Sequence, residues 1–365
     1  MNLHRNLLNF SGGPGVLPAT VLAQAQQAIE EVPEVGLSVL GISHRSDWFA
    51  EVVAETERNI AQLLHLPANY AVLLLQGGAT LQFSMIPMLL LRQRQCAADY
   101  VRSGYWSSKS IPPAQLEGAV RILWDGELNG FRDLPRAAEL SYSPDAAYLH
   151  YVSNETVEGI QFHELIGDDA VPRVCDMSSD MLSRPFDASR FALIYAHAQK
   201  NLGPAGVTLV IMRRELLDHA PANLPEMLDY RAHLAAHSIY NTPPVFAIYV
   251  TLLVTRWLRH DIGGLAQMDA LNRAKAAALY AVIDDNAEMY RGHAARAHRS
   301  LMNVVFTLPT LDLERNFLQQ AAERGFSGLK GHRSLGGIRA SIYNAMTTEA
   351  VAALGQFMTD FARRV

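Results

Sequence analysis

The chain is poor in the residue types that mark several protein classes. Its 365 residues include only two cysteines, Cys96 and Cys175, without paired spacing. Neither a disulfide framework nor a zinc ribbon is therefore expected, and a reducing cytoplasm fits best. Charged residues make up only 18% of the chain, with a formal net charge of −5. That balance gives no basis for binding nucleic acid or an acidic membrane surface.

Long apolar runs are also lacking. The apolar run from Val245 to Leu253 is interrupted by Tyr249 and Thr251, whereas a membrane span needs about 20 apolar residues. We interpret this run as a buried helix at a core or subunit interface. The segment from Met1 to Asn6 lacks the apolar region of a signal peptide. We therefore expect a cytoplasmic protein without a membrane partner.

The chain does contain a regular alternation of strand-like and helix-like segments. Short apolar runs predict strands at 70–75, 98–101, 120–123, 147–151, 174–176, 191–196 and 206–212. Helical spacing of apolar residues predicts helices at 18–32, 48–64 and 81–91. Nearly continuous apolar strands that alternate with helices are typical of an α/β fold, with a mostly parallel sheet covered by helices on both faces.

The pattern changes after about residue 260. An alanine-rich helix at 265–286 is followed by a strand at 302–306, a helix at 311–324, a strand at 337–342 and a final helix ending near 364. This second part predicts a smaller α+β domain. We expect a large domain of residues 16–260 and a small domain of residues 261–365. Residues 1–15 are expected to form an N-terminal segment that packs with the small domain.

Lys200 is the most informative residue of the chain. It lies between two apolar runs that are predicted to be buried strands, where a lysine is costly to desolvate unless it is used or neutralised. Asp176 ends another short strand 24 residues earlier. An internal amine and a strand-end acid are what a pyridoxal phosphate site needs. The amine forms an imine with the cofactor, and the acid keeps the pyridine nitrogen protonated.

Other segments could complete such a site, although each also has a plainer interpretation. Gly77 to Thr80 joins a strand to a helix, where free amides suit a phosphate group, but a tight turn explains the glycines equally well. Trp106 could stack on a pyridine ring or be a core residue. Thr156 could offer a hydroxyl, and alone it indicates little.

Two glycine-rich segments do not match the common nucleotide-binding patterns. No lysine–serine or lysine–threonine pair follows Gly77 and Gly78, so the segment is not a Walker loop. No strand precedes Gly12 to Gly15, so that segment is not a dinucleotide fingerprint. His163 and Glu164 have no second histidine at metalloprotease spacing, and no metal site is expected.

Basic residues indicate an anionic substrate. His44 and Arg45 lie in a loop between two predicted helices, and His332, Arg333 and Arg339 lie within eight residues of one another. Guanidinium groups bind carboxylate and phosphate through two hydrogen bonds. A solvated basic patch is the alternative. Arg339 lies in a predicted strand with alternating apolar and polar residues, and such a pattern does not by itself make its side chain exposed.

Taken together, these segments resemble the phosphoserine aminotransferases, which are class V members of the fold-type I pyridoxal phosphate enzymes. The resemblance covers essentially the whole chain. The segments that match are Asn9-Phe10-Ser11 with Gly13-Pro14, Ser43-His44-Arg45, Ala98-Asp99-Tyr100-Val101 with Gly104-Tyr105-Trp106, Asn154-Glu155-Thr156, Ser183-Arg184-Pro185, Ala198-Gln199-Lys200-Asn201, Tyr240-Asn241-Thr242-Pro243-Pro244, Gly331-His332-Arg333 and Arg339-Ala340-Ser341-Ile342-Tyr343-Asn344.

The resemblance implies a role for each matching site residue. Lys200 would form the imine, and Asp176 would pair with the pyridine nitrogen. The remaining contacts to the cofactor would come from Trp106 on the ring, Thr156 and Gln199 on its oxygens, and the amides around Ala79 and Thr80 on its phosphate. Asn241 and Thr242 would reach the phosphate in the neighbouring subunit, which implies a homodimer with shared sites.

The resemblance also implies how the substrate is held. Arg339 would bind the α-carboxylate, and His44 and Arg45 would bind the distal anion, with His332 and Arg333 contributed across the dimer. Two positions depart from the family. The better-known bacterial members carry an arginine where Thr80 stands, and that arginine helps to bind substrate phosphate. Gly12 replaces a serine that can contact substrate.

The activity implied is transamination between L-glutamate and 3-phosphohydroxypyruvate, which gives O-phosphoserine and 2-oxoglutarate in serine biosynthesis. Some family members also act in vitamin B6 synthesis, on an oxoacid derived from phosphorylated hydroxythreonine. Serine–glyoxylate transamination is an alternative within class V, and it would not need His44, Arg45, His332 and Arg333. Cysteine desulfuration would need a mobile cysteine. A non-catalytic protein that binds the cofactor is a further alternative.

Overall fold

The computed structural model of the chain describes residues 5–364. The first four residues of the expected N-terminal segment, Met1 to His4, lie outside the described part. The strands are β1 (Tyr70–Leu75), β2 (Ala98–Arg102), β3 (Val120–Asp125), β4 (Leu149–Val152), β5 (Asn154–Glu155), β6 (Ile160–Gln161), β7 (Arg173–Asp176), β8 (Leu193–His197), β9 (Thr208–Arg213), β10 (Arg291–Gly292), β11 (Asn303–Thr307) and β12 (Ile338–Ser341).

The helices that apolar spacing predicted are all present, whereas those at 105–115 and 230–235 were not predicted. The helices are α1 (Ala19–Glu30), α2 (Asp47–Leu63), α3 (Gly78–Leu90), α4 (Tyr105–Gln115), α5 (Tyr230–Ala235), α6 (Val245–His260), α7 (Leu265–Asp285), α8 (Leu311–Glu323) and α9 (Thr348–Arg364). Helix α3 begins three residues earlier than predicted. Gly77 adopts a left-handed backbone conformation (φ 91°), so the chain turns tightly after β1 and the helix begins at the next residue. The predicted helix at 245–253 is the first part of α6.

A seven-stranded sheet forms the centre of the larger lobe, in the order β1-β9-β8-β7-β4-β2-β3. Strand β9 is antiparallel to both of its neighbours, and the pairs from β8 through to β3 are parallel. The prediction of a mostly parallel sheet is therefore confirmed. The short β5–β6 hairpin was not predicted, because its two-residue strands carry no apolar run.

Both faces of this sheet are covered, as the alternation of side chains along β8 requires. Ile194 and Ala196 pack into one hydrophobic cluster with α2 and α6, whereas Leu193 and Tyr195 pack into a second cluster with α3 and α4. Successive strand residues point to opposite faces. A strand with apolar residues at every position is therefore stable only between two layers of helices.

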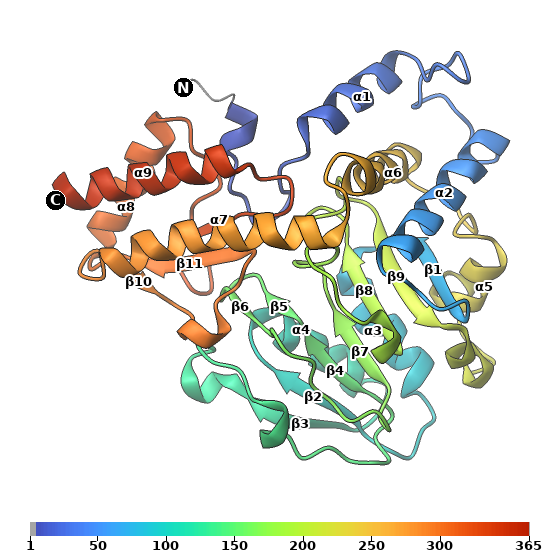
Figure 1. The fold of residues 1–365 in the computed structure, drawn as a ribbon. Helices are drawn as coiled ribbons and strands as arrows, with labels where there is room; N and C mark the ends of the chain where they lie inside the picture. The colour runs from blue at the N-terminus through green and yellow to red at the C-terminus, as the bar shows by residue number, and fades with distance from the viewer. Residues whose placement is uncertain (1–4, 365) are drawn as a thin grey trace.

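A third hydrophobic cluster holds the smaller lobe together, in which α7, α8 and α9 surround the sheet β10-β11-β12 (Figure 1). Leu265 and Met268, at the start of α7, belong to the cluster of the larger lobe, whereas Ala276 and Leu279 belong to that of the smaller lobe. The division at residue 260 stays a prediction. The burial pattern favours a boundary inside α7.

The N-terminal segment joins the smaller lobe before the chain enters the larger one. Phe10 is buried in the cluster of the smaller lobe. Its backbone N–H donates to Ser327 O (2.8 Å), and its carbonyl accepts from Ser341 N (3.1 Å). The chain then passes Gly12 to Gly15 and continues into α1. The segment therefore lies between residues from the last tenth of the sequence and the larger lobe.

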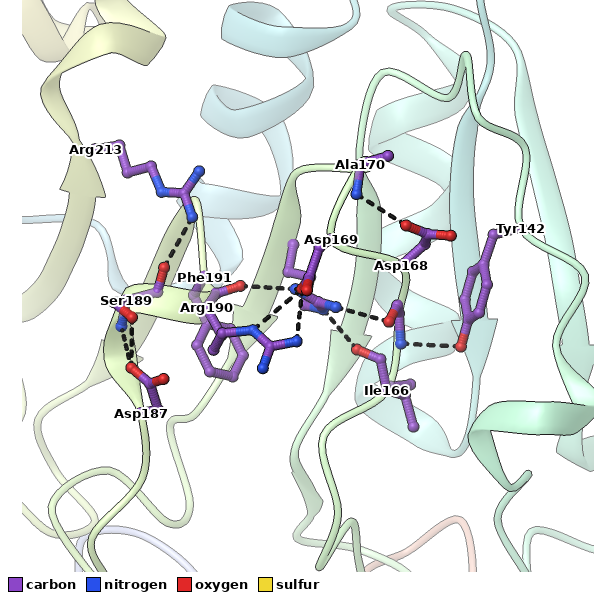
Figure 2. A network of polar contacts seen from close by, with 12 residues as sticks. Tyr142, Ile166, Asp168, Asp169, Ala170, Asp187, Ser189, Arg190, Phe191 and Arg213 are labelled. Carbon is purple, nitrogen blue, oxygen red and sulfur yellow. Dashed lines mark hydrogen bonds and ion pairs between the residues drawn. The ribbon is translucent and has the colours of Figure 1, made fainter.

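A polar network links the loops at the beginning of β7 and β8 (Figure 2). The buried Arg173 donates to the carbonyl oxygens of Ile166 (2.8 Å), Gly167 (2.7 Å) and Arg190 (3.0 Å) and to Asp169 (2.8 Å). These bonds hold the loop before β7 against the loop before β8. The opposite ends of the same two strands, at Asp176 and His197, are left open for a site, as is usual in α/β sheets.

Candidate active site

A cavity of about 260 Å³ lies beyond the carboxyl ends of β4, β7 and β8. It brings together residues that are far apart in the sequence. Its lining consists of Ala79, Thr80, Trp106, Val152, Asn154, Asp176, Ser178, Ser179, His197, Gln199 and Lys200. Six predicted site residues thus line one cavity. A seventh predicted residue, Thr156, accepts a hydrogen bond from the Lys200 amine.

Lys200 lies in the turn after β8, with its amine directed at two hydroxyl groups. Nζ donates to Thr156 Oγ1 (2.6 Å) and to Ser179 Oγ (2.9 Å), and it lies 5.6 Å from the centre of the Trp106 ring. Burial lowers the pKa of Lys200 to about 8, although the nearby Asp176 carboxylate opposes this shift. The amine is therefore far closer to its neutral, nucleophilic form than an exposed lysine.

Asp176 is the last residue of β7 and is buried. Its Oδ1 accepts from Ser178 N (2.8 Å). Burial raises the pKa of Asp176, whereas the bond from Ser178 and the Lys200 amine lower it. No ion pair within 4.0 Å joins Asp176 to a cationic residue of the described chain. A protonated ring nitrogen in the cavity would supply the missing positive partner.

The start of α3 provides backbone donors. Ala79 and Thr80 line the cavity and occupy the first turn of this 13-residue helix. The first N–H groups of a helix have no partner within the helix, and the helix dipole favours an anion there. This arrangement suits a phosphate group. The left-handed backbone of Gly77 and Gly78 confirms the turn, and the approach of a ligand to these glycines stays a prediction.

Orphaned polar atoms test whether the cavity fits pyridoxal phosphate. Trp106 Nε1 and Gln199 Oε1 are buried without a hydrogen-bond partner in the described structure, and both side chains line the cavity. Buried polar atoms are normally bonded, so a bound polar molecule would satisfy them. With the amine, the acid, the aromatic ring and the free helix amides in place, the residues fit the cofactor.

Arg339 projects from β12 beside this cavity. Its guanidinium packs on the backbone of Gly12, where a Cβ atom would come within 2.3 Å of Arg339 Nη2. The next residue, Gly13, would place a Cβ 3.4 Å from Gln199 Cγ. Arg339 Nε is buried without a partner, and burial lowers the pKa of the guanidinium. A half-buried arginine in the described chain without a bound acceptor is suited to hold a carboxylate.

His332 approaches the cavity of its own chain. Its ring lies 4.7 Å from the ring of Tyr105, which precedes Trp106, and Nδ1 lies 2.7 Å from Ser334 Oγ. Burial, together with Arg339 and Arg333, lowers the pKa of His332. The sequence had predicted a contribution across a dimer. Within one chain, His332 packs against Tyr105, and its contribution across a dimer stays a prediction. Arg333 is exposed next to it.

Four predicted site residues lie away from this cavity. His44 is half-buried and Arg45 is exposed in the loop before α2, where the Arg45 N–H donates to Ser43 Oγ (3.2 Å). Asn241 and Thr242 are exposed in the loop before α6. Asn241 Nδ2 donates to Gln76 Oε1 (3.2 Å), and Gln76 Nε2 donates to Thr242 O (2.8 Å). One chain alone does not bring these four residues to Lys200.

Sequence reasoning assigned no site role to five residues of the lining, which are Val152, Asn154, Ser178, Ser179 and His197. Ser178 Oγ accepts from His197 N (3.1 Å), and Ser179 bonds to Lys200. The signal available was their position, because both serines directly follow the strand-end Asp176 and His197 ends β8. Polar residues just beyond the carboxyl ends of parallel strands commonly line ligand sites.

Between residues 5 and 364, no helix has the length and apolar character to cross a membrane. Over the same residues, no group of three or more histidine, cysteine or acidic side chains is placed to hold a metal ion.

Comparisons with known proteins agree with this geometry. The family model for class V aminotransferases matches residues 7–354. The phosphoserine aminotransferase of Laribacter hongkongensis is 50% identical over 98% of this chain and 99% of its own. The structure of phosphoserine aminotransferase from Bacillus circulans subsp. alkalophilus is 44% identical, with a TM-score of 0.94 over 97% of this chain and 98% of that one.

Another phosphoserine aminotransferase structure, described for radiation damage of its Schiff base, is 42% identical. It has a TM-score of 0.95 over 98% of both chains. The prediction of the fold is thereby confirmed over nearly the full length. The chain belongs to the class V aminotransferase family, alongside the phosphoserine aminotransferases.

Proposed function

We propose that the protein is a pyridoxal phosphate-dependent aminotransferase that converts L-glutamate and 3-phosphohydroxypyruvate into 2-oxoglutarate and O-phospho-L-serine. The observation that carries the proposal is the single cavity that contains the Lys200 amine, the buried Asp176 carboxylate and the free amides of α3, with the unpartnered Arg339 beside it. Relatives named phosphoserine aminotransferase, up to 50% identical over nearly the whole chain, support the choice of substrates.

The cofactor would supply an aldehyde for amines and an electron sink for the carbon next to the amino group. Lys200 would bind it covalently. Asp176 would keep the proton on its ring nitrogen, while Trp106 would lie on its ring and the amides of Ala79 and Thr80 on its phosphate. Thr156 and Gln199 would contact its oxygens.

Lys200 also has the position and pKa to move the proton during transamination. With the substrate bound, the Lys200 amine would take the proton from the substrate Cα and hold it for the transfer that the cofactor's electron sink makes possible. A group with a pKa of about 8 can both accept and donate a proton near neutral pH. Thr156 and Ser179 would hold the amine in place meanwhile.

Arg339 would bind the α-carboxylate that both substrates share, and His332 would lie at the distal end in the same chain. His44, Arg45, Asn241 and Thr242 would act in the site of a second subunit. The apolar residues Leu22, Ile29, Leu37 and Leu40 support this homodimer, because they are 40–66% exposed along α1 and the loop that leads to His44. A second copy that covers them would remove this apolar surface from water.

The deciding experiment is an assay of glutamate with 3-phosphohydroxypyruvate, glyoxylate and the oxoacid derived from phosphorylated hydroxythreonine as alternative acceptors. Parallel initial-rate plots are expected, because one product leaves before the second substrate binds. In Arg45→Ala, KM for the phosphorylated oxoacid should rise about tenfold or more, with the exposed Arg94→Ala as control. Intersecting plots would contradict the mechanism, and preferred turnover of glyoxylate would favour serine–glyoxylate transamination.

Cysteine desulfuration is disfavoured by the positions of both cysteines. Cys175 is buried in β7, and burial, followed by Asp180 and Asp176, raises the pKa of its thiol well above the usual range. Cys96 precedes β2 and is absent from the lining of the cavity. Neither thiol is a reactive, mobile group at Lys200.

A further inference from the structure

Two buried glutamates lie in the turn that connects β5 to β6. Glu155 is 1% exposed and Glu158 is 5% exposed. No lysine, arginine or histidine of the described chain forms an ion pair with either residue within 4.0 Å. Burying carboxyl groups without a cation in contact is costly. Their other contacts must therefore explain their position.

These contacts are made to the start of α4, the helix that carries Trp106. Glu155 accepts from Trp106 N with Oε2 (3.0 Å) and from Ser107 N with Oε1 (2.9 Å). Glu158 Oε1 accepts from Tyr105 N (2.9 Å). These are three of the N–H groups that a helix leaves free at its beginning. The turn thereby fixes the backbone of Trp106 on both sides.

The same turn also reaches the other wall of the cavity. Thr156, which lies between the two glutamates in the sequence, accepts from Lys200 Nζ (2.6 Å). One short turn therefore sets both the amine and the backbone from which the aromatic ring projects. A shift of this turn would change their relative position.

The two carboxyl groups are close neighbours. A Cβ atom on Gly104 would lie 2.6 Å from Glu158 Oε2 and 2.7 Å from Glu155 Cδ. Two buried negative charges at such a place repel each other, and one proton relieves the repulsion. Glu155 is the better anion, because both of its oxygens accept N–H bonds. Glu158 Oε2 is buried without a partner.

We propose that Glu155 and Glu158 are positioning residues that hold one proton between them, on Glu158, and set the plane of the Trp106 ring through the first turn of α4. The role of Trp106 against the cofactor rests on the proposed function. The charge state agrees with the surroundings, since burial and then Glu155 raise the pKa of Glu158 well above its usual range.

The test compares Glu155→Gln with Glu158→Gln, which are matched changes in one turn. Glutamine at position 158 replaces a protonated carboxyl by a neutral group of the same shape, so the circular dichroism of the bound cofactor should stay at its wild-type value. Glutamine at position 155 offers one acceptor oxygen in place of two. The dichroism should then fall, and kcat should fall about tenfold, whereas Glu155→Asp should recover part of both. Glu164→Gln, an exposed carboxyl beyond β6, is the control.

A second readout needs neither cofactor nor activity. The infrared spectrum of the protein at neutral pH should contain a band from the protonated carboxyl of Glu158, besides any from Glu57, whose pKa burial raises to about 7. Glu158→Gln should remove the Glu158 band alone. The proposal is overturned if Glu158→Gln removes no band, or if both glutamine variants change the dichroism equally. Should Glu155→Gln fail to fold, the infrared band alone decides. A wild-type protein without transaminase activity would refute the proposed function and leave the infrared result interpretable.

Discussion

A lysine amine in water has a pKa of about 10.4 and is almost wholly protonated at neutral pH. Burial lowers the pKa of Lys200 to about 8, because the charged amine is less well hydrated in the cavity than in water. The neighbouring hydroxyls of Thr156 and Ser179 can bond to the amine in either charge state. The local surroundings thus prepare this residue for covalent chemistry before any ligand binds.

The pH dependence of cofactor capture follows from this pKa. Only the neutral amine attacks an aldehyde, so in protein stripped of cofactor the rate of covalent capture should rise about tenfold per pH unit below pH 8 and level off above it. Rapid mixing of the stripped protein with pyridoxal phosphate at a series of pH values measures this rate. A rate that keeps rising to about pH 10 would indicate an ordinary lysine.

Gly12 is required by Arg339. Because a Cβ atom at position 12 would lie within 2.3 Å of Arg339 Nη2, Gly12→Ala should displace the guanidinium from its present position. Losing one charge-assisted bond to a carboxylate corresponds to about 1.5–3 kcal/mol. KM for glutamate and for the oxoacid should therefore both rise about tenfold to a hundredfold, as steady-state kinetics would measure.

A matched control is Gly41→Ala, because a Cβ atom there would meet only Ser38 O at 3.6 Å. That variant should keep both KM values. If Gly12→Ala raised KM for only one substrate, Arg339 would not be the group that binds the carboxylate common to both.

At the scale of the elements, a buried lysine holds the loop after β12. Lys275, on α7, is 2% exposed, and its amine donates to the carbonyl oxygens of Tyr343 (2.7 Å), Met346 (3.0 Å) and Ile342 (3.1 Å). Tyr343 in turn donates from its hydroxyl to Gly12 O (2.7 Å). The helix of the smaller lobe thereby supports the segment that packs on Arg339.

Lys275→Met should leave several buried carbonyl oxygens without a donor and cost about 3 kcal/mol or more in the free energy of unfolding. Urea unfolding measures the loss. The exposed Lys330→Met should change stability by less than about 0.5 kcal/mol. Equal losses in both variants would mean that the carbonyl contacts of Lys275 contribute nothing specific.

The elements themselves could be predicted from the sequence far better than the contacts between them. The run at 70–75 is strand β1 with the same limits, because an apolar segment between turn residues can be buried only in this way. The role of the β5–β6 turn could not be predicted from the sequence. It depends on hydrogen bonds that Glu155 and Glu158 accept from a helix about 50 residues away. The contact of His332 with Tyr105 could not be predicted for the same reason, because it is tertiary.

At the scale of the whole molecule, the proposed role of Arg45 in the neighbouring subunit predicts that activity requires two chains. If Arg45 serves the neighbouring subunit, a hybrid dimer of Lys200→Ala and Arg45→Ala chains contains one intact site. Random pairing makes about half of the dimers hybrid, each with one of its two sites intact, so about one quarter of the wild-type activity should return. Co-refolding of equal amounts of the two variants measures this, with the phosphorylated oxoacid kept well below the raised KM of Arg45→Ala so that its own homodimers contribute little activity.

Arg339 and His332 provide the controls, because both lie at the site of their own chain. Hybrids of Lys200→Ala with Arg339→Ala or with His332→Ala have no complete site, and mixing should restore nothing. If the hybrid with His332→Ala recovered activity, His332 would act in the site of the neighbouring subunit. If the hybrid with Arg45→Ala recovered no activity, Arg45 would act in the site of its own chain or in neither site.

The interleaving of the first residues with the last has a consequence for biosynthesis. Phe10 and Gly12 leave the ribosome at the start of translation, yet their hydrogen-bond partners at Ser327, Ser341 and Tyr343 are among the final residues to be made. The site proposed for the substrate carboxylate, at Gly12 and Arg339, can therefore form only after the chain is nearly complete. A product of premature termination, however well its large sheet folds, would lack this proposed site.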